Sequence, residues 1–184
     1  REGLVSIIHP WEAGRDNSID WDQAFERVPT EGISEYTRRD TEHTNPEHRP
    51  TKEQYDRYLW LVEHFRSLGW DNSKLHDASP FQVVDPGFNA ILIRSCFDLA
   101  ALAEELEMDD VAQRNYAWAR QSLESLENLW SDQHRQYLCQ DRTTGQLIES
   151  SSVGGLLAVF APIRHTRAQA IAQRIEQISA ECLF

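Results

Sequence analysis

The sequence predicts an all-α fold in which antiparallel helical hairpins close into a ring. Several segments carry apolar residues at the spacing of one helical face, and they follow one another in pairs. Long irregular connections alternate with short ones, so the long connections should gather at one end of the helices and build a pocket there. A stack of tetratricopeptide-like repeats is the main structural competitor, but no fixed period recurs along the chain.

The first helical segment is short and is followed by a long polar loop. Trp21 and Phe25 lie on the apolar face of a helix expected over residues 19–28, and Pro29 ends it. Residues 30–50 show little periodicity and are expected to form an exposed loop that covers a site as a lid. The His and Glu residues of that loop match no metal-ligand spacing, so no metal site is predicted.

A capping box begins the second helix. The hydroxyl of Thr51 is placed to accept from an amide of the first turn, while the side chain of Gln54 reaches back to the backbone of Thr51. Apolar residues continue at helical spacing to Leu68, and Gly69 is placed to end the helix in a left-handed conformation. Residues 70–84 are expected to form an irregular connection.

The most apolar helix begins at Asp85 and Pro86, a strong start signal because Asp accepts from free amides and Pro fits the first turn. It is too apolar to be expected on a surface. Its expected buried side carries Phe88, Ile91, Leu92, Ser95, Leu99, Leu102 and Leu106. Asp109 is expected to cap the next helix, whose apolar stripe runs to Trp130. The link is short, so the two helices should be antiparallel neighbours.

The last part of the chain is less regular. Residues 137–149 are expected to form one small β-hairpin, with Gly145 at a position that favours positive φ. Residues 151–161 are expected to form a short buried helix. Thr166 and Gln169 repeat the capping-box pattern before a final helix.

Composition limits the class of protein and its partners. The 184 residues are 40% hydrophobic, enough for one core, and a single domain over residues 1–184 is predicted. Because the chain starts at Arg1 without a leader, it is expected to be an excerpt of a larger domain. No apolar run is long enough to span a bilayer, so no membrane partner is predicted. A formal net charge of −12 argues against a nucleic-acid partner. Nothing indicates the oligomeric state.

The three cysteines suggest a reducing environment. Cys96, Cys139 and Cys182 are far apart and form no Cys-x-x-Cys pair, so neither a disulfide framework nor a zinc ribbon is indicated. Cys96 lies on an apolar helical face and is interpreted as a small buried hydrophobe. A cytoplasmic location is therefore expected.

Residues 8–18 hold the chemistry of the chain. Trp11 offers an apolar face for a sugar ring, and Glu12 and Asn17 are placed to bind sugar hydroxyls. Asp16 is a carboxyl group beside them. Taken alone, Asp16-Asn17-Ser18 are more typical of a helix N-cap than of a catalytic site, and Trp11 is as typical of core packing as of sugar binding.

Three segments resemble one family. The run His9-Pro10-Trp11-Glu12-Ala13-Gly14-Arg15-Asp16-Asn17-Ser18, with Trp21-Asp22 after it, resembles the signature of bacterial α-glycosidases related to glycoside hydrolase family 63. Within them it is most similar to the mannosylglycerate and glucosylglycerate hydrolases. Residues 49–59 and 79–92 add to the resemblance, which covers most of the chain. The sequence departs from the pattern at Ala13 and at Ile19-Asp20, which bears on the fine positioning of the site.

The resemblance implies both a fold and a reaction. The fold is an (α/α)6 barrel, of which this chain would be a part, and the reaction is hydrolysis of an α-glycosidic bond with inversion. It implies Asp16 as the general acid, a small-molecule glycoside as substrate and no cofactor. Tyr55 and Asn89 are weaker candidates for substrate contacts.

The chemistry of inversion needs two carboxyl groups. One must be protonated near neutral pH to protonate the leaving oxygen, and the other must activate water on the opposite face. Burial beside Trp11 and Trp21, together with the charge of Glu12, is therefore expected to raise the pKa of Asp16, with Arg15 turned away.

The second carboxylate is not evident in these residues. The base is expected beyond Phe184, because Glu149, the only tempting substitute, is interpreted as a loop residue. This chain would then supply only the acid, and it would be inactive by itself. The alternative from another class is a non-catalytic helical-repeat or carbohydrate-binding module.

Overall fold

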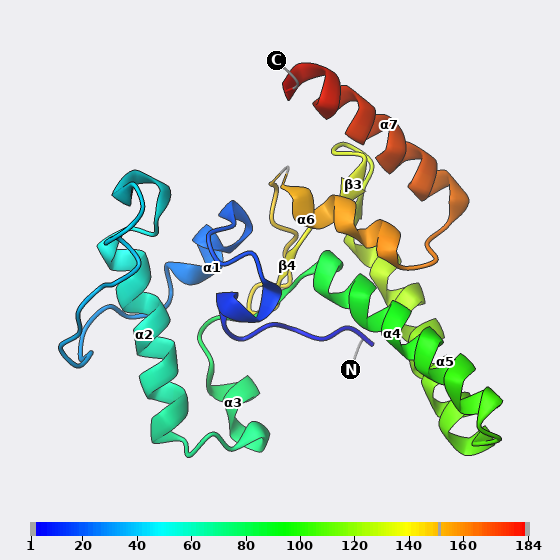
Figure 1. The fold of residues 1–184 in the computed structure, drawn as a ribbon, viewed down its shortest axis with the longest axis horizontal. Helices are drawn as coiled ribbons and strands as arrows, with labels where there is room; N and C mark the ends of the chain where they lie inside the picture. The colour runs from blue at the N-terminus through cyan, green and yellow to red at the C-terminus, as the bar shows by residue number, and fades with distance from the viewer. Residues whose placement is uncertain (1–2, 151, 183–184) are drawn as a thin grey trace. The chain divides into compact units, whose positions relative to one another are not determined.

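The structure, a computed structural model, describes residues 3–150 and 152–182 and is mostly helical with a few short strands (Figure 1). The predicted all-α class is confirmed at this level. The chain divides into two compact units. The loop unit comprises Ser6–Val83 and Asp141–Gly145. The hairpin unit comprises the residues up to Val5, Val84–Gln140 and those from Gln146 onward. That the whole chain forms one domain stays a prediction.

The loop unit begins with short helical turns. A 3-10 turn spans Pro10–Ala13, and a second, Ile19–Trp21, leads into α1, Asp22–Phe25. The helix expected over residues 19–28 is thus shorter than predicted, although its apolar side is buried as expected. In the following loop, the structure forms only one further 3-10 turn, at Pro46–His48, among mostly exposed residues.

The capping box of α2, Lys52–Ser67, is confirmed. Thr51 Oγ1 accepts from the amide of Gln54 at 3.2 Å, and Gln54 Oε1 accepts from the amide of Thr51 at 2.9 Å. Gly69 follows the helix with φ at 67°, as expected of a left-handed terminator.

The prediction that residues 70–84 are irregular was wrong. They contain α3, Asn72–Ala78, and β1, Val83–Val84. Asp71 caps α3 by accepting from the amide of Ser73 at 3.0 Å. An Asp before a run of helix-compatible residues is a helix start signal, and the prediction of an irregular connection did not use it.

Aromatic packing forms the centre of the loop unit. The ring of Phe25 lies 4.8 Å from that of Tyr58 on α2 and 5.7 Å from that of Phe81, and Phe81 meets Trp21 edge-on. The backbone of Ile7 pairs with that of Val83 through two hydrogen bonds of 2.8 and 3.0 Å. These contacts fix the segment that enters the motif at residue 8.

The hairpin unit is built on two long helices. Helix α4, Pro86–Glu105, lies beside α5, Asp109–Leu126, after a link of three residues (Figure 1). Asp85 caps α4 as predicted, accepting from the amides of Gly87 and Phe88 at 2.7 and 3.4 Å. Asp109 is the first residue of α5 rather than its cap, because Met108 occupies the cap position.

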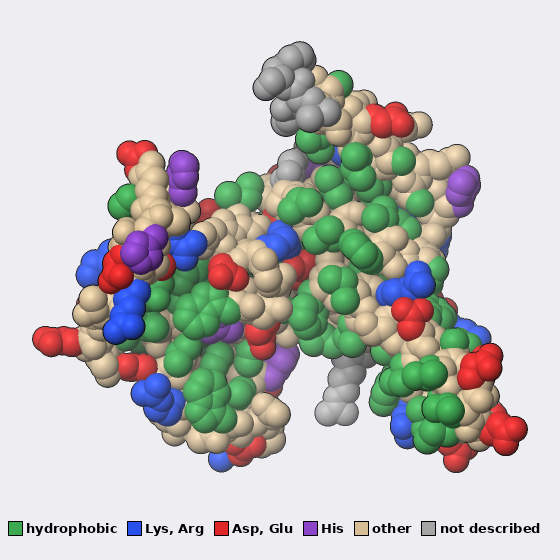
Figure 2. All heavy atoms as spheres, viewed as in Figure 1, with side chains coloured by type: hydrophobic (Ala, Val, Ile, Leu, Met, Phe, Trp, Pro, Cys, Tyr) green, Lys and Arg blue, Asp and Glu red, His purple; other side chains and the backbone are tan. Residues whose placement is uncertain are grey.

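The predicted buried side of α4 is exposed, except at Phe88, which is half-buried. Leu99 is 48% exposed, Leu102 56% and Leu106 61%, while the buried side carries Ala100 and Ala103. Small residues on the buried side permit close approach of the two helices. Both faces of α4 are apolar, so spacing alone cannot tell which one is buried. Figure 2 shows hydrophobic side chains on the surface over this hairpin. Cys96, on the same helix, is only partly buried, against the prediction.

A β-hairpin lies next to the predicted one. Strand β2, Trp130–Ser131, pairs antiparallel with β3, Gln136–Tyr137, and Arg135 turns the chain with φ at 53°. Strand β4, Gln140–Asp141, pairs with β1. Of the hairpin expected over residues 137–149, the structure keeps the turn, with Gly145 at φ 73°, and a single bridge. No sequence signal marks the turn between β2 and β3, because its residue at positive φ is Arg135 rather than a glycine.

The last residues that the structure describes form three helical pieces. Helix α6, Val153–Leu156, continues as the 3-10 turn Leu157–Phe160, and α7 spans His165–Cys182. The expected short helix is partly exposed, with Phe160 at 54%, and its predicted first residue, at position 151, lies outside the described residues. Thr166 falls inside α7, so the capping box predicted there was wrong.

Within the described ranges, no helix combines the length and the apolar character needed to cross a membrane.

Candidate functional site

The Trp11 loop, residues 8–18, is fixed at its start by a reciprocal cap. His9 Nδ1 accepts from the amide of Trp11 at 3.1 Å. Glu12 Oε2 accepts from the amides of Ile8 and His9 at 2.7 and 3.1 Å. One oxygen of Glu12 therefore serves the loop itself, which competes with the sugar-binding role predicted for this residue.

His9 is buried, with 6% of its surface exposed, and both ring nitrogens have partners. Nε2 lies 3.1 Å from the carbonyl oxygen of Tyr58, which can only accept, so Nε2 carries the proton and Nδ1 is left as the acceptor for Trp11. Burial lowers the pKa of His9, against the opposing effects of the Tyr58 carbonyl and the Asp16 charge. The ring is therefore neutral.

Tyr58, on α2, connects the helix to the acidic part of the loop. Its hydroxyl donates to the carbonyl oxygen of Asp16 at 2.7 Å and lies 3.5 Å from Asn17 Oδ1. Burial, with the charges of Asp16 and Asp22, raises the pKa of Tyr58 to about 12, so the phenol remains a donor. The sequence signals for Tyr58 were its position in an apolar stripe and its place in one of the segments that resemble the family, and neither indicated the contact with Asp16.

A second cluster holds the other side of the loop. Arg15 Nη1 donates to Asp20 Oδ2 at 2.8 Å and to Ser18 Oγ at 3.0 Å. The guanidinium of Arg15 lies over the ring of Trp21, whose Nε1 donates to the Arg15 carbonyl at 2.8 Å. The ion pair with Asp20 agrees with the expectation that Arg15 turns away from Asp16. Ser18, rather than Asp16, caps the next helical turn.

The predicted burial of Asp16 is not found. Asp16 and Asn17 are exposed, and Trp21 packs in the core at 2% exposure. Gly14, with φ at 66°, ends the 3-10 turn between Glu12 and Asp16, so the two carboxylates do not lie on one helical turn. Trp11 is 43% exposed and is therefore no core residue, although its ring contacts those of His9 and Tyr58. The loop presents an aromatic face, a carboxylate and an amide to solvent.

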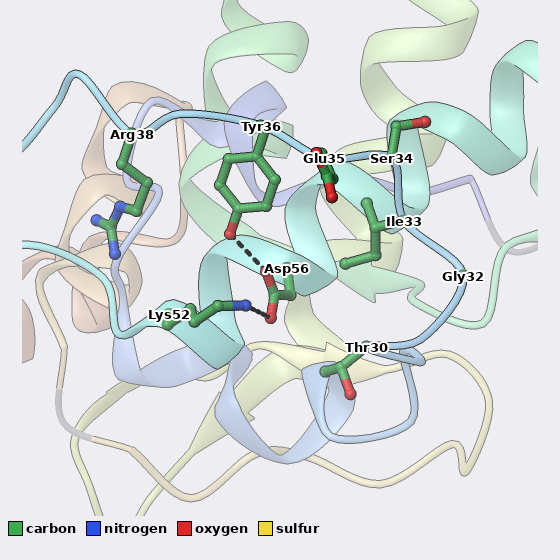
Figure 3. A pocket seen from close by; sticks show the side chains of 9 residues that line it. All are labelled: Thr30, Gly32, Ile33, Ser34, Glu35, Tyr36, Arg38, Lys52 and Asp56. Carbon is green, nitrogen blue, oxygen red and sulfur yellow. Dashed lines mark hydrogen bonds and ion pairs between the residues drawn. The ribbon is translucent and has the colours of Figure 1, made fainter.

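A pocket of about 510 Å³ lies between the loop after α1 and the first turns of α2 (Figure 3). Its wall carries Tyr36, whose hydroxyl donates to Asp56 Oδ1 at 2.5 Å, and Lys52, whose Nζ donates to Asp56 Oδ2 at 2.7 Å. Burial and the bond to Asp56 raise the pKa of Tyr36 to about 12. The loop predicted to be a lid is thus tied to α2 by a polar network.

Tyr55 belongs to this network. Its ring stacks on that of Tyr36 at 5.5 Å, and the guanidinium of Arg38 lies over it at 4.6 Å. Arg38 also pairs with Asp40 and lowers the pKa of that carboxyl to about 2. Tyr36 and Arg38 thus occupy part of the ring surface that the predicted substrate contact would otherwise use.

Asn89 lies apart from these residues in the chain, in the hairpin unit, and is 1% exposed. Its Oδ1 accepts from the amide of Val5 at 2.8 Å, and its Nδ2 donates to the carbonyls of Val5 and Asp85 at 2.9 Å each. The amide group is committed to backbone, so the structure gives no support to the predicted substrate contact.

One further carboxyl group with a shifted pKa, that of Asp22, was not predicted from the sequence. Asp22, the first residue of α1, has its pKa raised by burial and, to a lesser extent, by Glu26 and Asp20. Its place directly after Trp21 in the motif was the available signal. No three His, Cys, Asp or Glu residues in the described part of the chain are grouped to hold a metal ion.

We expect Tyr58→Phe to lower the free energy of unfolding by about 1 kcal/mol, the typical net value of one hydrogen bond. It should also reduce turnover, because the backbone of Asp16 loses its tie to α2. Urea unfolding and steady-state kinetics measure the two effects. Tyr116→Phe, which removes one exposed hydrogen bond from a tyrosine hydroxyl to Glu104, is the matched control, and equal effects of both variants would contradict this role of the Asp16 tie.

Comparison with known proteins gives consistent matches. Residues 1–182 match the family model described as the mannosylglycerate hydrolase MGH1-like glycoside hydrolase domain. A mannosylglycerate hydrolase of Thermus thermophilus is 45% identical over 178 residues, which cover 96% of this chain and 42% of that protein. Mannosylglycerate hydrolase MGH1 of Selaginella moellendorffii is 37% identical over 94% of this chain and 36% of its own length.

Among solved structures, the family 63 mannosylglycerate hydrolase of Thermus thermophilus in complex with Tris and D-glycerate matches with a TM-score of 0.92 at 44% identity. The match covers 97% of this chain and 44% of that one. The chain therefore spans less than half the length of the relatives that it matches.

Proposed function

Because the chain belongs to the mannosylglycerate hydrolase MGH1-like glycoside hydrolases, we propose that the protein hydrolyses the α-glycosidic bond of a small glycoside. The substrates that we propose are mannosylglycerate and glucosylglycerate. The observation that carries the proposal is the Trp11 loop, in which an exposed aromatic ring, carboxylate and amide lie on a backbone fixed from both sides.

In the proposed reaction, Asp16 is the general acid. Its proton passes to the glycosidic oxygen as the bond between that oxygen and the anomeric carbon breaks, and water attacks from the opposite face. A second carboxylate takes the proton of that water, and we place it outside these 184 residues. Trp11 stacks on the sugar, and the side-chain amide of Asn17 and the hydroxyl of Tyr55 bind polar groups of the substrate.

We also propose that the helices form part of an (α/α)6 barrel. The exposed apolar side of α4 supports this, because a surface of leucines at helical spacing is suited to packing against a further helix. In the barrel, neighbouring elements would cover Asp16 and supply the burial that the described residues do not give it.

The test is hydrolysis by the full-length protein, followed by proton NMR. Mannosylglycerate and glucosylglycerate are compared with a methyl α-mannoside, which lacks the glycerate. We expect cleavage of a glycerate glycoside, with the β-anomer of the free sugar appearing before mutarotation. First release of the α-anomer contradicts inversion. Saturable sugar binding without any cleavage contradicts the enzyme and supports the carbohydrate-binding module.

A further inference from the structure

His9 joins three parts of the loop unit. Its backbone amide donates to Glu12, its Nδ1 accepts from the amide of Trp11, and its Nε2 donates to the carbonyl of Tyr58 on α2. Its ring also packs against those of Trp11 and Tyr58, with centroids 4.5 and 5.8 Å away. His9 therefore holds the first turn of the Trp11 loop against the helix that fastens its last part.

We infer that His9 is a positioning residue for Asp16 and that it acts only as the neutral imidazole, so that protonation of His9 loosens the Trp11 loop. This deepens the proposed function and rests on it only where activity is measured. His9 contacts Trp11, the proposed sugar platform, but it is assigned no part in the transfer of the proton to the glycosidic oxygen.

The geometry allows one protonation state. A carbonyl oxygen cannot donate, so Nε2 must hold a proton, and the amide of Trp11 cannot accept, so Nδ1 must not. A second proton would set two N–H donors against each other across 3.1 Å. At 6% exposure there is little room for water to relieve that repulsion, so the ring or the turn must move.

Movement at His9 reaches Asp16 through Tyr58. The backbone carbonyl of Tyr58 accepts a hydrogen bond from His9 Nε2, and the hydroxyl of Tyr58 donates to the backbone of Asp16 at 2.7 Å. Trp11, the proposed sugar platform, loses its cap in the same event. Both the platform and the acid thus depend on one imidazole.

The groups around His9 set the direction of the pH dependence. On its own loop these are the carboxylates of Glu12 and Asp16, on α2 the protonated phenol of Tyr58, and on the segment after α3 the uncharged Ser79, whose hydroxyl donates to the Ile8 carbonyl. Asp16 and the Tyr58 carbonyl favour the cation, but burial opposes it more strongly and lowers the pKa of His9.

The sign follows from proton binding in the two states. Below the ordinary pKa of about 6.5, the unfolded chain binds a proton at residue 9 that the folded chain resists. Stability therefore falls as the pH drops below that value and is fully kept above it. The folded state that holds the Trp11 loop in place is the one in which the His9 imidazole is neutral.

The test compares wild type with His9→Asn in the full-length protein. Asn keeps an acceptor for the Trp11 amide, as a good helix cap, but does not titrate. We expect wild type to lose more of its urea midpoint between pH 7.5 and 5 than the variant, and the acidic limb of kcat/KM to shift to lower pH in the variant. His64→Asn, which replaces a histidine on α2 bonded to Ala78, is the matched control and should leave both profiles unchanged.

Nitrogen NMR of wild type covers the case in which His9→Asn fails to fold. At neutral pH we expect Nε2 of His9 to be protonated and Nδ1 to be bare, and acidification should broaden the Trp11 amide signal as the ring titrates. The opposite tautomer, or a His9 charged at neutral pH, overturns the inference. So do identical pH profiles in wild type and His9→Asn.

The readouts separate the two proposals. Unfolding and NMR need no substrate. If the protein cleaves no glycoside, the proposed function is refuted, but these two measurements still test the role of His9. If the protein cleaves the glycoside but the acidic limb of its kcat/KM profile is the same in wild type and His9→Asn, only the role of His9 is refuted.

Discussion

Asp16→Asn in the full-length protein is expected to lower kcat on mannosylglycerate by about 10²- to 10⁴-fold, the usual contribution of a general acid. An amide has the shape of the carboxyl group but no proton acidic enough to transfer to the leaving oxygen. The tie to Tyr58 uses the backbone carbonyl of Asp16, and the side chain is exposed, so the fold and KM should change little.

The leaving group makes this test specific. An aryl glycoside departs without full protonation, so Asp16→Asn should lose less activity on it than on mannosylglycerate. Glu12→Gln is the control, because its amide oxygen still accepts from the amides of Ile8 and His9. An Asp16→Asn enzyme with wild-type turnover on both substrates rules out the assignment of the acid.

Gly155→Ala is expected to destabilise the protein by more than about 3 kcal/mol, beyond the usual cost of overpacking a core. A Cβ at position 155 would lie 1.9 Å from the carbonyl oxygen of Tyr137, and no side-chain rotation can move a backbone atom. Helix α6 and strand β3 would have to separate. Tyr137 is fully buried in the core of the hairpin unit, so the disturbance should spread.

Urea unfolding measured by circular dichroism gives the comparison with wild type. Val153→Ala, in the same short helix but at a position 56% exposed, is the control and should change stability little. If Gly155→Ala costs less than about 1 kcal/mol, within the ordinary range for point mutants, the close packing of α6 on β3 is wrong.

Elements defined by local signals could be predicted, and those defined by packing could not. Thr51 with Gln54, and Asp85 before Pro86, bond to their own first turns, so the sequence alone locates α2 and α4. The buried face of α4 depends on what lies beside it. The turn at Arg135 adopts positive φ with a residue that carries no such preference.

The same division holds for the site. Trp11, Asp16 and Asn17 are neighbours in sequence, and the motif brought them together. His9 and Tyr58 are 49 positions apart, and their contact runs through a main-chain carbonyl, which no residue pattern records. Asn89 has the composition of a ligand-binding residue, but its partners are the backbones of Val5 and Asp85.

The exposed side of α4 has a consequence for how its neighbour must lie. Its apolar positions 88, 92, 99, 102 and 106, with Ser95 between them, alternate in steps of four and three, which is the a/d pattern of a heptad repeat. Side chains at this spacing pack between those of a second helix when the two helix axes cross at a shallow angle of about 20° rather than at a steep one. A helix that covers α4 in the proposed barrel would then lie nearly parallel to its axis, and we expect a chain in which this apolar side stays bare to self-associate as its concentration rises.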